Sequence, residues 1–429
     1  MTDLPVDGER LREDIERNAT FGSIDAEAGP ARTVLPGTPA NRRARSYLVD
    51  RMEAAGLDVQ VDAVGNVTGT WTPPGIEESQ DGEREGSHQP IAAGSHLDSV
   101  PQGGIFDGVL GVYAALESVR AIKSSDREVV HPLTVVCFTG EEGTRFSDGV
   151  LGSSVAAGRL TVEDALNLSD GNVTLRESLD DIGFRGCERL DASEWDAWLE
   201  LHVEQSDTLE RASAPVGIVT SITGTLRCRI IIEGGSDHAG TTAMADRTDA
   251  LAAASEFVLA VEASAREATQ VDDSAVATVG SLQVSPDVVN VVPGGVELSV
   301  DLRSVNAATI ERMVDDVTEK LSELERERGV STTLERPYDI SPQPMADRAQ
   351  QALRRASMVV GVDAPSLPSG AGHDTMQVAT VTDAGLLFAR SRGGYSHSPS
   401  EWTDWDDCTT ATQVLAAALT ELTGPGAEH

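Results

Sequence analysis

The sequence is poor in cysteine and has no long apolar run. Its four cysteines (Cys137, Cys187, Cys228 and Cys408) stand far apart, which predicts free or buried thiols in a reducing compartment. This spacing argues against a disulfide framework and against a zinc knuckle. No apolar run approaches the ~18 residues of a membrane span, and the polar N-terminus lacks the apolar core of a signal peptide. We therefore predict a cytoplasmic protein.

Basic residues are scarce, and lysine is the scarcest of them. Thirty-three Lys and Arg residues face 70 Asp and Glu residues, so the formal net charge is -37, and Lys123 and Lys320 are the only lysines. This charge repels the phosphates of nucleic acids and anionic membranes, so neither is expected as a partner. An acidic, lysine-poor surface is expected of a protein from a cytoplasm of very high salt, where screening suppresses self-repulsion.

The length of 429 residues predicts two or three domains. Near Ala214 the pattern changes to one of four strands and two long helices, which predicts an antiparallel sheet with helices on one face. The strands are expected at 216–222, 227–233, 275–284 and 296–303, and the helices at 245–266 and 307–328. A helix and strand pattern resumes further on. The sequence thus predicts an α/β catalytic domain, residues 1–213 and 337–429, interrupted by an α+β insert, residues 214–336.

Residues 91–108 carry the first cluster of chemically active side chains. The apolar run from Ile91 to Ala93 predicts a buried strand that delivers His96 and Asp98 to its carboxyl end, and two glycines then lead to Asp107 at the start of a helix. In open α/β sheets, ligands bind in the crevice at this end of the strands.

Further polar residues follow two other predicted strands and lie in a C-terminal loop. The run 132–140 ends in Glu141-Glu142, the run 198–201 ends in His202, and His397 lies among turn-forming residues. Together with His96 and Asp107, one of the two glutamates and these histidines make five ligands for a pair of divalent metals, with one carboxylate bridging. Mixed imidazole and carboxylate ligands favour Zn, Mn, Co or Ni over Ca or Mg.

Each of these residues taken alone also fits a simpler role. His96 beside Asp98 fits a salt bridge at the surface, and an adjacent glutamate pair in so acidic a chain fits a solvated turn. The position of both directly after an apolar strand favours the site. Asp98 itself is better placed to accept the second N–H of the His96 ring, and so to orient it, than to bind metal.

Several motifs resemble one known family in its own order, from about residue 30 to the C-terminus. They resemble the M20 metallopeptidase-like family, and within it the branch of amidases, hydantoinases and carbamoylases, which includes N-carbamoyl-L-amino-acid hydrolases, allantoate amidohydrolases and β-ureidopropionases. The motifs are His96-Leu-Asp98 with Asp107-Gly, Glu141-Glu142-Gly-Thr-Arg-Phe, Glu200-Leu-His202-Val-Glu204-Gln205, His238-Ala-Gly-Thr-Thr, Gly370-Ala-Gly-His373-Asp374 and Ser396-His397-Ser-Pro-Ser-Glu401.

The resemblance implies a zinc-peptidase-like catalytic domain, with the insert as a lid and dimerisation domain, and hence a homodimer. It also implies a two-metal site in which His96 and His202 hold one ion, Glu142 and His397 hold the other, and Asp107 bridges them. Glu141 would then act as the general base.

The resemblance further implies which residues bind a small ureido-acid substrate: Gln205, His238, Asn290, Arg303 and His373, of which His238, Asn290 and Arg303 would come from the neighbouring subunit. His238 could stabilise the developing oxyanion, and the Arg303 fork is a natural clamp for a carboxylate. From the residues alone, a loop histidine, a turn-capping asparagine and an arginine paired with surface acids remain alternatives. Two departures from the family pattern, Ala243 and Ser398, lie beside these substrate contacts.

The predicted function is a metal-dependent amidohydrolase that cleaves a linear C–N amide of an N-carbamoyl acid, and most readily of an N-carbamoyl-L-amino acid. Allantoate or β-ureidopropionate is the first alternative substrate. A dipeptidase or N-acyl-amino-acid hydrolase of the wider family is the second alternative, and a metal-binding protein without turnover is the third. His202, where many of the peptidases have an acidic ligand, favours the ureido branch.

Overall fold

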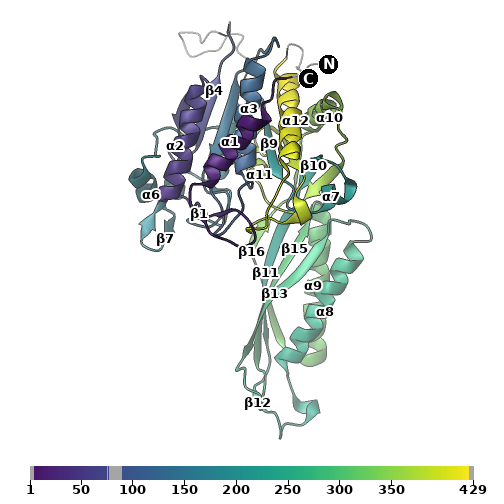
Figure 1. Cartoon of the computed structure of the whole chain (residues 1–429). Coiled ribbons are helices and arrows are strands. Elements are labelled where there is room, and N and C mark those ends of the chain that lie inside the picture. Colours follow the sequence, from purple (N-terminus) through teal and green to yellow (C-terminus); the bar gives the residue numbers. More distant parts are fainter. Residues whose placement is uncertain (1–3, 75, 77–88, 425–429) are drawn as a thin grey trace. The chain divides into compact units, whose positions relative to one another are not determined.

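The computed structural model of the chain describes residues 4–74, 76 and 89–424 and divides into two compact units (Figure 1). The large unit comprises Met1–Thr220 and Met345–His429, and the inserted unit comprises Ser221–Pro344. The sequence predicted an insert of residues 214–336, whereas the structure places it at 221–344.

The large unit is built on a nine-stranded mixed sheet. Its central strands are parallel and run in the order β19 (Asp383–Ala389), β9 (Ala197–Val203), β5 (Ile91–His96) and β6 (Leu133–Phe138). Every residue of β5, β6 and β9 is buried, as is typical of strands covered on both faces. The flanking strands are β4 (Val67–Trp71) and β3 (Asp58–Val61) beyond β6, and β10 (Val216–Ile222), β17 (Gln343–Pro344) and β18 (Ser366–Ser369) beyond β19.

Helices cover both faces of this sheet. Ile91 and Ala93 of β5 belong to the main core with helices α1, α3, α10 and α12, of which α1, α3 and α12 lie side by side in Figure 1. Ala92, between them, belongs to a second core that contains residues of α4 and α11 and the stacked rings of Trp195 and Trp198. The helices are α1 (Gly8–Ala19), α2 (Pro39–Ala54), α3 (Val109–Lys123), α4 (Leu151–Ala156), α5 (Val162–Asn167), α6 (Leu175–Ile182), α7 (Thr208–Ala212), α10 (Asp347–Val360), α11 (Thr375–Val378) and α12 (Trp405–Thr423).

The inserted unit is an antiparallel four-stranded sheet with two long helices, as predicted. Burial alternates along the central strands, and the buried side chains pack against both helices, whose first turns are capped by Asp249 and Asn306. The sheet order is β13 (Val276–Ser285), β15 (Gly295–Ser304), β11 (Gly224–Glu233) and β16 (Ser331–Ile340). The helices are α8 (Ala250–Ala268) and α9 (Ala307–Arg328), and β12 (Asp237–His238) pairs with β14 (Val291–Val292).

The prediction of Val216–Ile222 as a strand of the insert is wrong. This strand, β10, pairs with β19 in the nine-stranded sheet, and Ser331–Ile340 is the fourth strand of the inserted unit. The physical reason is visible in burial, because β10 is buried on both faces whereas β11 alternates. The end of β10 also pairs with β17, where Ile222 lies opposite Gln343.

Two expectations from composition can be compared with the described residues. All four cysteines are free, and Cys187 alone of them is exposed. Within the described part of the chain, no helix is long and apolar enough to cross a membrane.

Candidate active site

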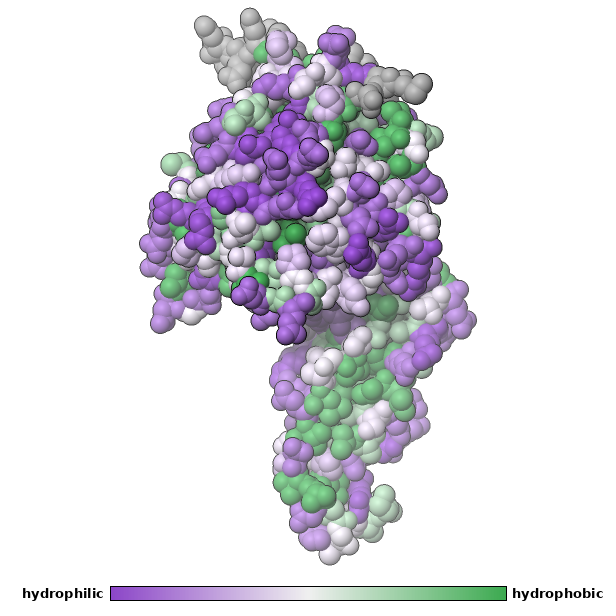
Figure 2. Space-filling view, in the orientation of Figure 1, coloured by the Kyte–Doolittle hydropathy of each residue, from purple (hydrophilic) through white to green (hydrophobic). Residues whose placement is uncertain are grey.

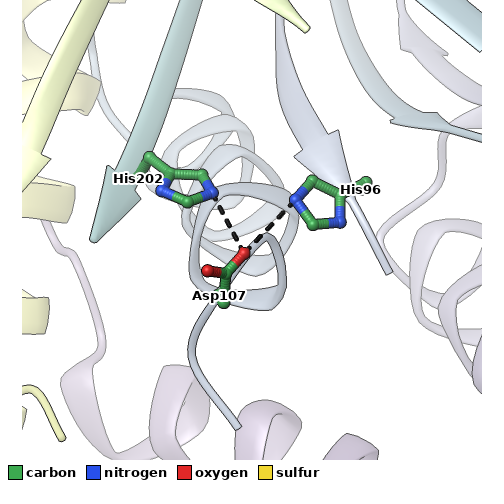
Figure 3. Close-up of side chains that lie close together, drawn as sticks. All are labelled: His96, Asp107 and His202. Atoms are coloured by element: carbon green, nitrogen blue, oxygen red, sulfur yellow. Dashed lines mark ion pairs between the residues drawn. The ribbon is translucent and has the colours of Figure 1, made fainter. Parts of the chain in front are cut away.

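The predicted ligands converge at the carboxyl edge of the central strands. His96 is the last residue of β5, His202 lies near the end of β9, and Asp107 belongs to the loop that leads into α3. Because β5 and β9 are parallel, both histidines reach the same edge, and Figure 3 shows Asp107 between them. Gly108 permits this approach, since a Cβ there would lie 2.4 Å from the His96 ring.

Asp107 lies between two groups of ligand atoms. Its Oδ1 is 3.5 Å from His96 Nε2 and 3.3 Å from His202 Nε2. Its Oδ2 is 3.6 Å from His397 Nε2, which is also 3.1 Å from Glu142 Oε2. Of the three clusters able to hold a cation among the described residues, the two that contain predicted ligands alone share Asp107, and the third comprises Glu200, His202 and His373.

The hydrogen bonds of His96 and His202 use the Nδ1 atom of each ring and leave the Nε2 atom facing Asp107. The Nδ1 of His96 lies 3.2 Å from the Asp98 carbonyl and that of His202 lies 3.0 Å from the Val203 carbonyl, so each Nδ1–H donates to an oxygen. When the rings are neutral, both Nε2 atoms therefore face a carboxylate oxygen acceptor to acceptor, and His96 Nε2 has no hydrogen-bond partner among the described residues. A cation between them satisfies all three atoms, so these residues fit a divalent metal.

Electrostatics favour a positive charge in the same place. Burial lowers the pKa of both His96 and His202, but the carboxylates around them outweigh this effect and raise it above the ordinary value. The hydrogen bond with Glu142 raises the pKa of His397 to about 9. His397 is also the most open of these ligands, with a side chain 51% exposed against 1% for His96.

Asp98 has a different role from the one predicted. Its carboxylate lies 3.8 Å from the His96 ring, beyond hydrogen-bond distance, and the ring is oriented by the Asp98 backbone carbonyl instead. The carboxylate accepts backbone N–H groups of Gly140, Glu141 and Glu142 at 3.2, 3.4 and 3.2 Å. Asp98 therefore holds the turn that presents both glutamates.

The two glutamates of that turn face different partners. Glu142 pairs with His397, whereas the Oε2 of Glu141 lies 3.7 Å from His96 Nε2 and its carboxylate makes no hydrogen bond within the described residues. Burial and the nearby carboxylates Asp374, Glu142 and Asp107 raise the pKa of Glu141 well above its usual range, against the effect of His96. A carboxylate beside the ligands with no partner of its own is suited to proton transfer.

Gln205 and His373 also reach this cluster. The Gln205 side chain donates to Asp107 Oδ2 at 2.9 Å, while its Oε1 is buried without a partner. The His373 ring lies 4.5 Å from the His202 ring, and its Nε2 is 2.9 Å from the Ser369 hydroxyl. Burial first, and then the neighbouring histidines, lower the pKa of His373, so its ring is neutral.

The other predicted substrate residues belong to the inserted unit. The Nδ1 of His238 accepts the Gly240 N–H at 2.9 Å, so its neutral ring carries the proton on Nε2 and can donate it. The backbone carbonyl of Asn290 accepts the Ala239 N–H. Asn290 lies beside His238 because β12 and β14 are paired. Arg303 lies near the C-terminal end of β15, and its side chain donates to the Asp301 carboxylate.

Sequence reasoning gave no role to several buried charged residues around the cluster, among them Glu200, Arg32 and Glu401. Glu200 is fully buried and accepts from Ser95 and Thr375, so its carboxylate is already satisfied. Arg32 and Glu401 are buried against the loop that carries Asp107. Glu401 could have been found from its place in the His397 motif, whereas Arg32 stands in no pattern that marks it.

Comparisons with known proteins relate the whole chain to one family. The model of Peptidase family M20/M25/M40 matches residues 92–421. An N-carbamoyl-L-amino-acid amidohydrolase of Paenarthrobacter aurescens is 36% identical over 430 residues, covering 98% of this chain and 100% of the relative. An allantoate deiminase of Arabidopsis thaliana is 32% identical, covering 95% of this chain and 81% of the relative. The crystal structure of a hydantoinase/carbamoylase family amidase from Burkholderia multivorans superposes with a TM-score of 0.89 at 31% identity, covering 99% and 100% of the two chains.

Proposed function

Because the chain belongs to peptidase family M20/M25/M40, in its branch of carbamoylases and related amidases, we propose that it hydrolyses N-carbamoyl-L-amino acids with two divalent metals. Water adds to the carbamoyl carbon, one of its C–N bonds breaks, and the resulting carbamate then loses carbon dioxide as the second C–N bond breaks. One ureido acid and one water then give one amino acid, ammonia and carbon dioxide. The observation that carries the proposal is Asp107, whose two oxygens face two separate groups of ligands.

In this proposal, His96, His202 and Asp107 would hold one ion, and Glu142, His397 and Asp107 would hold the other. Two divalent ions there would make a water nucleophilic near neutral pH and polarise the scissile carbonyl. The mixed imidazole and carboxylate donors suit Zn, Mn, Co or Ni.

Glu141 is the proposed general base. It accepts a proton from the water at its carboxylate and delivers that proton to the leaving nitrogen. Its separation from the ligand Glu142 by a single peptide bond allows one turn to supply both functions. The three backbone bonds to Asp98 support this role because they keep the turn in one conformation.

The proposed substrate contacts require two copies of the inserted unit. Arg303 lies near the C-terminal end of β15. The pair of His238 and Asn290 lies beyond the N-terminal end of this strand, where Gly295 is the first residue. Eight steps along a strand already span about 26 Å, more than the length of a small ureido acid. We therefore assign Arg303 and the His238–Asn290 pair at one active site to different subunits of a homodimer, in place of the earlier prediction that all three come from the neighbouring subunit.

The surface of the inserted unit supports this dimer. Apolar residues gather on its visible face in Figure 2. Strand β13 is at the edge of its sheet, and helix α8 packs beside it. Exposed large apolar side chains of the unit are Met244, Leu259, Val271, Val276, Leu282, Val288 and Val289. An open strand edge beside exposed apolar residues is suited to pairing with a second copy.

Allantoate is the second candidate substrate, supported by the similarity to the Arabidopsis allantoate deiminase. We further propose that the enzyme works in a cytoplasm of high salt, which the net charge of -37 and the free thiols support.

Release of ammonia from the ureido compounds, and of free amino acids from the dipeptides, by the chelated and metal-restored protein tests the proposal. The substrates are N-carbamoyl-L-amino acids, β-ureidopropionate, allantoate and dipeptides in molar potassium chloride, with Zn, Mn, Co or Ni added back. Metal-dependent turnover of an N-carbamoyl-L-amino acid above all others is expected. Cleavage of dipeptides alone would move the protein to the peptidases, and inactivity on every substrate would favour a metal-binding protein without turnover.

A further inference from the structure

The loop of residues 97–107, called here the ligand loop, has little regular structure although it carries the bridging carboxylate. Only an isolated bridge from Gly103 to Arg32 ties it to a strand. Most of its residues are buried, so their backbone groups need hydrogen-bond partners, because an unpaired buried amide is destabilising. Two buried charged side chains of opposite sign, Arg32 (0% exposed) and Glu401 (1% exposed), supply many of these partners.

Arg32 binds the carbonyl side of the ligand loop. Its guanidinium donates to the carbonyls of Leu97 at 3.1 Å and Gly104 at 3.2 Å, and at longer range to those of Asp98 and Asp107, at 3.4 and 3.5 Å. A fifth bond goes to the Asn18 side chain at 3.1 Å. The planar fork of arginine has five donors, so every one is used.

Glu401 binds the amide side of the same loop. Its Oε1 accepts the backbone N–H groups of Phe106 at 2.8 Å and Asp107 at 3.0 Å. Its Oε2 lies 3.2 Å from the hydroxyl of Ser396, next to His397 in the chain, and this hydroxyl donates over the shorter distance of 2.7 Å to Asp107 Oδ2. Gly104 leaves just enough room for this carboxylate, since a Cβ there would lie 2.2 Å from Oε1.

We propose that Arg32 and Glu401 are a pair of positioning residues that fix the ligand loop from its two sides and so set where Asp107 stands between the two metal sites. The proposal rests on the proposed two-metal function. The carbonyl of Asp107 is bound by one member of the pair and its N–H by the other, so the backbone of the bridging ligand is held at both ends. A bridging carboxylate must keep both oxygens aimed at different ions, and partners behind the ligands tune metal affinity in this way.

Cobalt binding to the metal-free protein tests the pair. Arg32→Lys retains the charge but cannot reach five acceptors, and Glu401→Ala removes both amide acceptors. Each is expected to weaken cobalt affinity about 10- to 100-fold in a chelator competition and to change the visible absorption of the bound cobalt. With cobalt at saturation, kcat should fall while KM stays near the wild-type value, because neither residue contacts the proposed substrate residues.

Two matched variants separate positioning from general stability. Glu401→Gln keeps an acceptor oxygen for the two amides, so its cobalt affinity and spectrum should return close to those of the wild type. Arg45→Lys alters an equally buried arginine, 1% exposed, whose hydrogen bonds go to Asn41, Gly65 and Thr139 rather than to the ligand loop. It should lower the melting temperature and leave the cobalt affinity unchanged.

The possible outcomes separate this proposal from the function on which it rests. Wild-type protein that binds no cobalt would overturn the proposed metal site and this inference with it. The wild type could bind cobalt while Glu401→Ala, like the Arg45→Lys control, keeps the wild-type affinity and spectrum. In that case the positioning role is wrong and the metal site stands. Should Arg32→Lys fail to fold, the comparison of Glu401→Ala with Glu401→Gln still decides the question.

Discussion

The adjacent glutamates offer the sharpest test of the site. The same substitution is predicted to remove catalysis at Glu141 and one bound metal at Glu142. Glu141→Gln removes a carboxylate that makes no hydrogen bond within the described residues, so the fold and both metal sites should persist. General acid–base catalysis contributes about 10²- to 10⁴-fold, so kcat should fall by that factor, equivalent to about 3–5 kcal/mol of activation free energy. Glu142→Gln instead removes the partner 3.1 Å from His397 and should lose one bound metal.

The assay combines metal content with steady-state rates of ammonia release at saturating metal. Glu141→Gln is expected to hold two metals per chain with a low kcat and a KM near that of the wild type. Two metals and a kcat within tenfold of the wild type would refute the assignment of the base. Loss of one metal in Glu141→Gln, with two retained in Glu142→Gln, would reverse the roles of the two residues.

Three further predictions follow from the subunits, the ligands and the surface. Mixing inactive His238→Ala and Arg303→Ala proteins should restore about a quarter of wild-type activity, because half of the dimers are mixed and one of their two sites is intact; no recovery would return both residues to one subunit. Metal affinity of the metal-free protein, measured by titration calorimetry between about pH 7 and 10, should rise with pH up to the His397 pKa of about 9, since protonated imidazole cannot bind a cation. Affinity independent of pH would remove His397 from the ligands. The melting temperature should rise between about 0.1 and 2 M potassium chloride as salt screens the net charge of -37; a flat or falling curve would contradict adaptation to high salt.

The convergence of site residues could be predicted because their positions follow from strand geometry. His96, Glu141 and His202 each come at or just after the end of a buried run, and parallel strands bring such ends to one edge. Which atom of Asp98 orients His96 could not be predicted, because it depends on the path of the loop. The role of Arg32 beside Glu401 could not be predicted for a similar reason, since 369 residues separate the two groups, which meet only after folding.

The fold was predicted well where strands had distinct burial patterns and less well at the boundary of the insert. β11 alternates between buried and exposed residues and was placed in the insert, where it lies. The prediction placed β10 in the four-stranded sheet of the insert, although its continuous apolar run is typical of a strand covered on both faces. β16 is an edge strand with mostly exposed residues, so its sequence carries little apolar signal.

The pairing of β10 with β17 gives the chain an architecture that protein engineering can use. Ile222 and Gln343 lie directly opposite each other where the polypeptide departs for the inserted unit and returns. Such neighbours are also the ends of an ordinary β-hairpin, which two residues such as Asn-Gly can close. In modular terms, the inserted unit occupies a hairpin loop, and a shortened chain with that turn in its place is a route to a minimal metalloprotein for studying ion binding apart from substrate recognition.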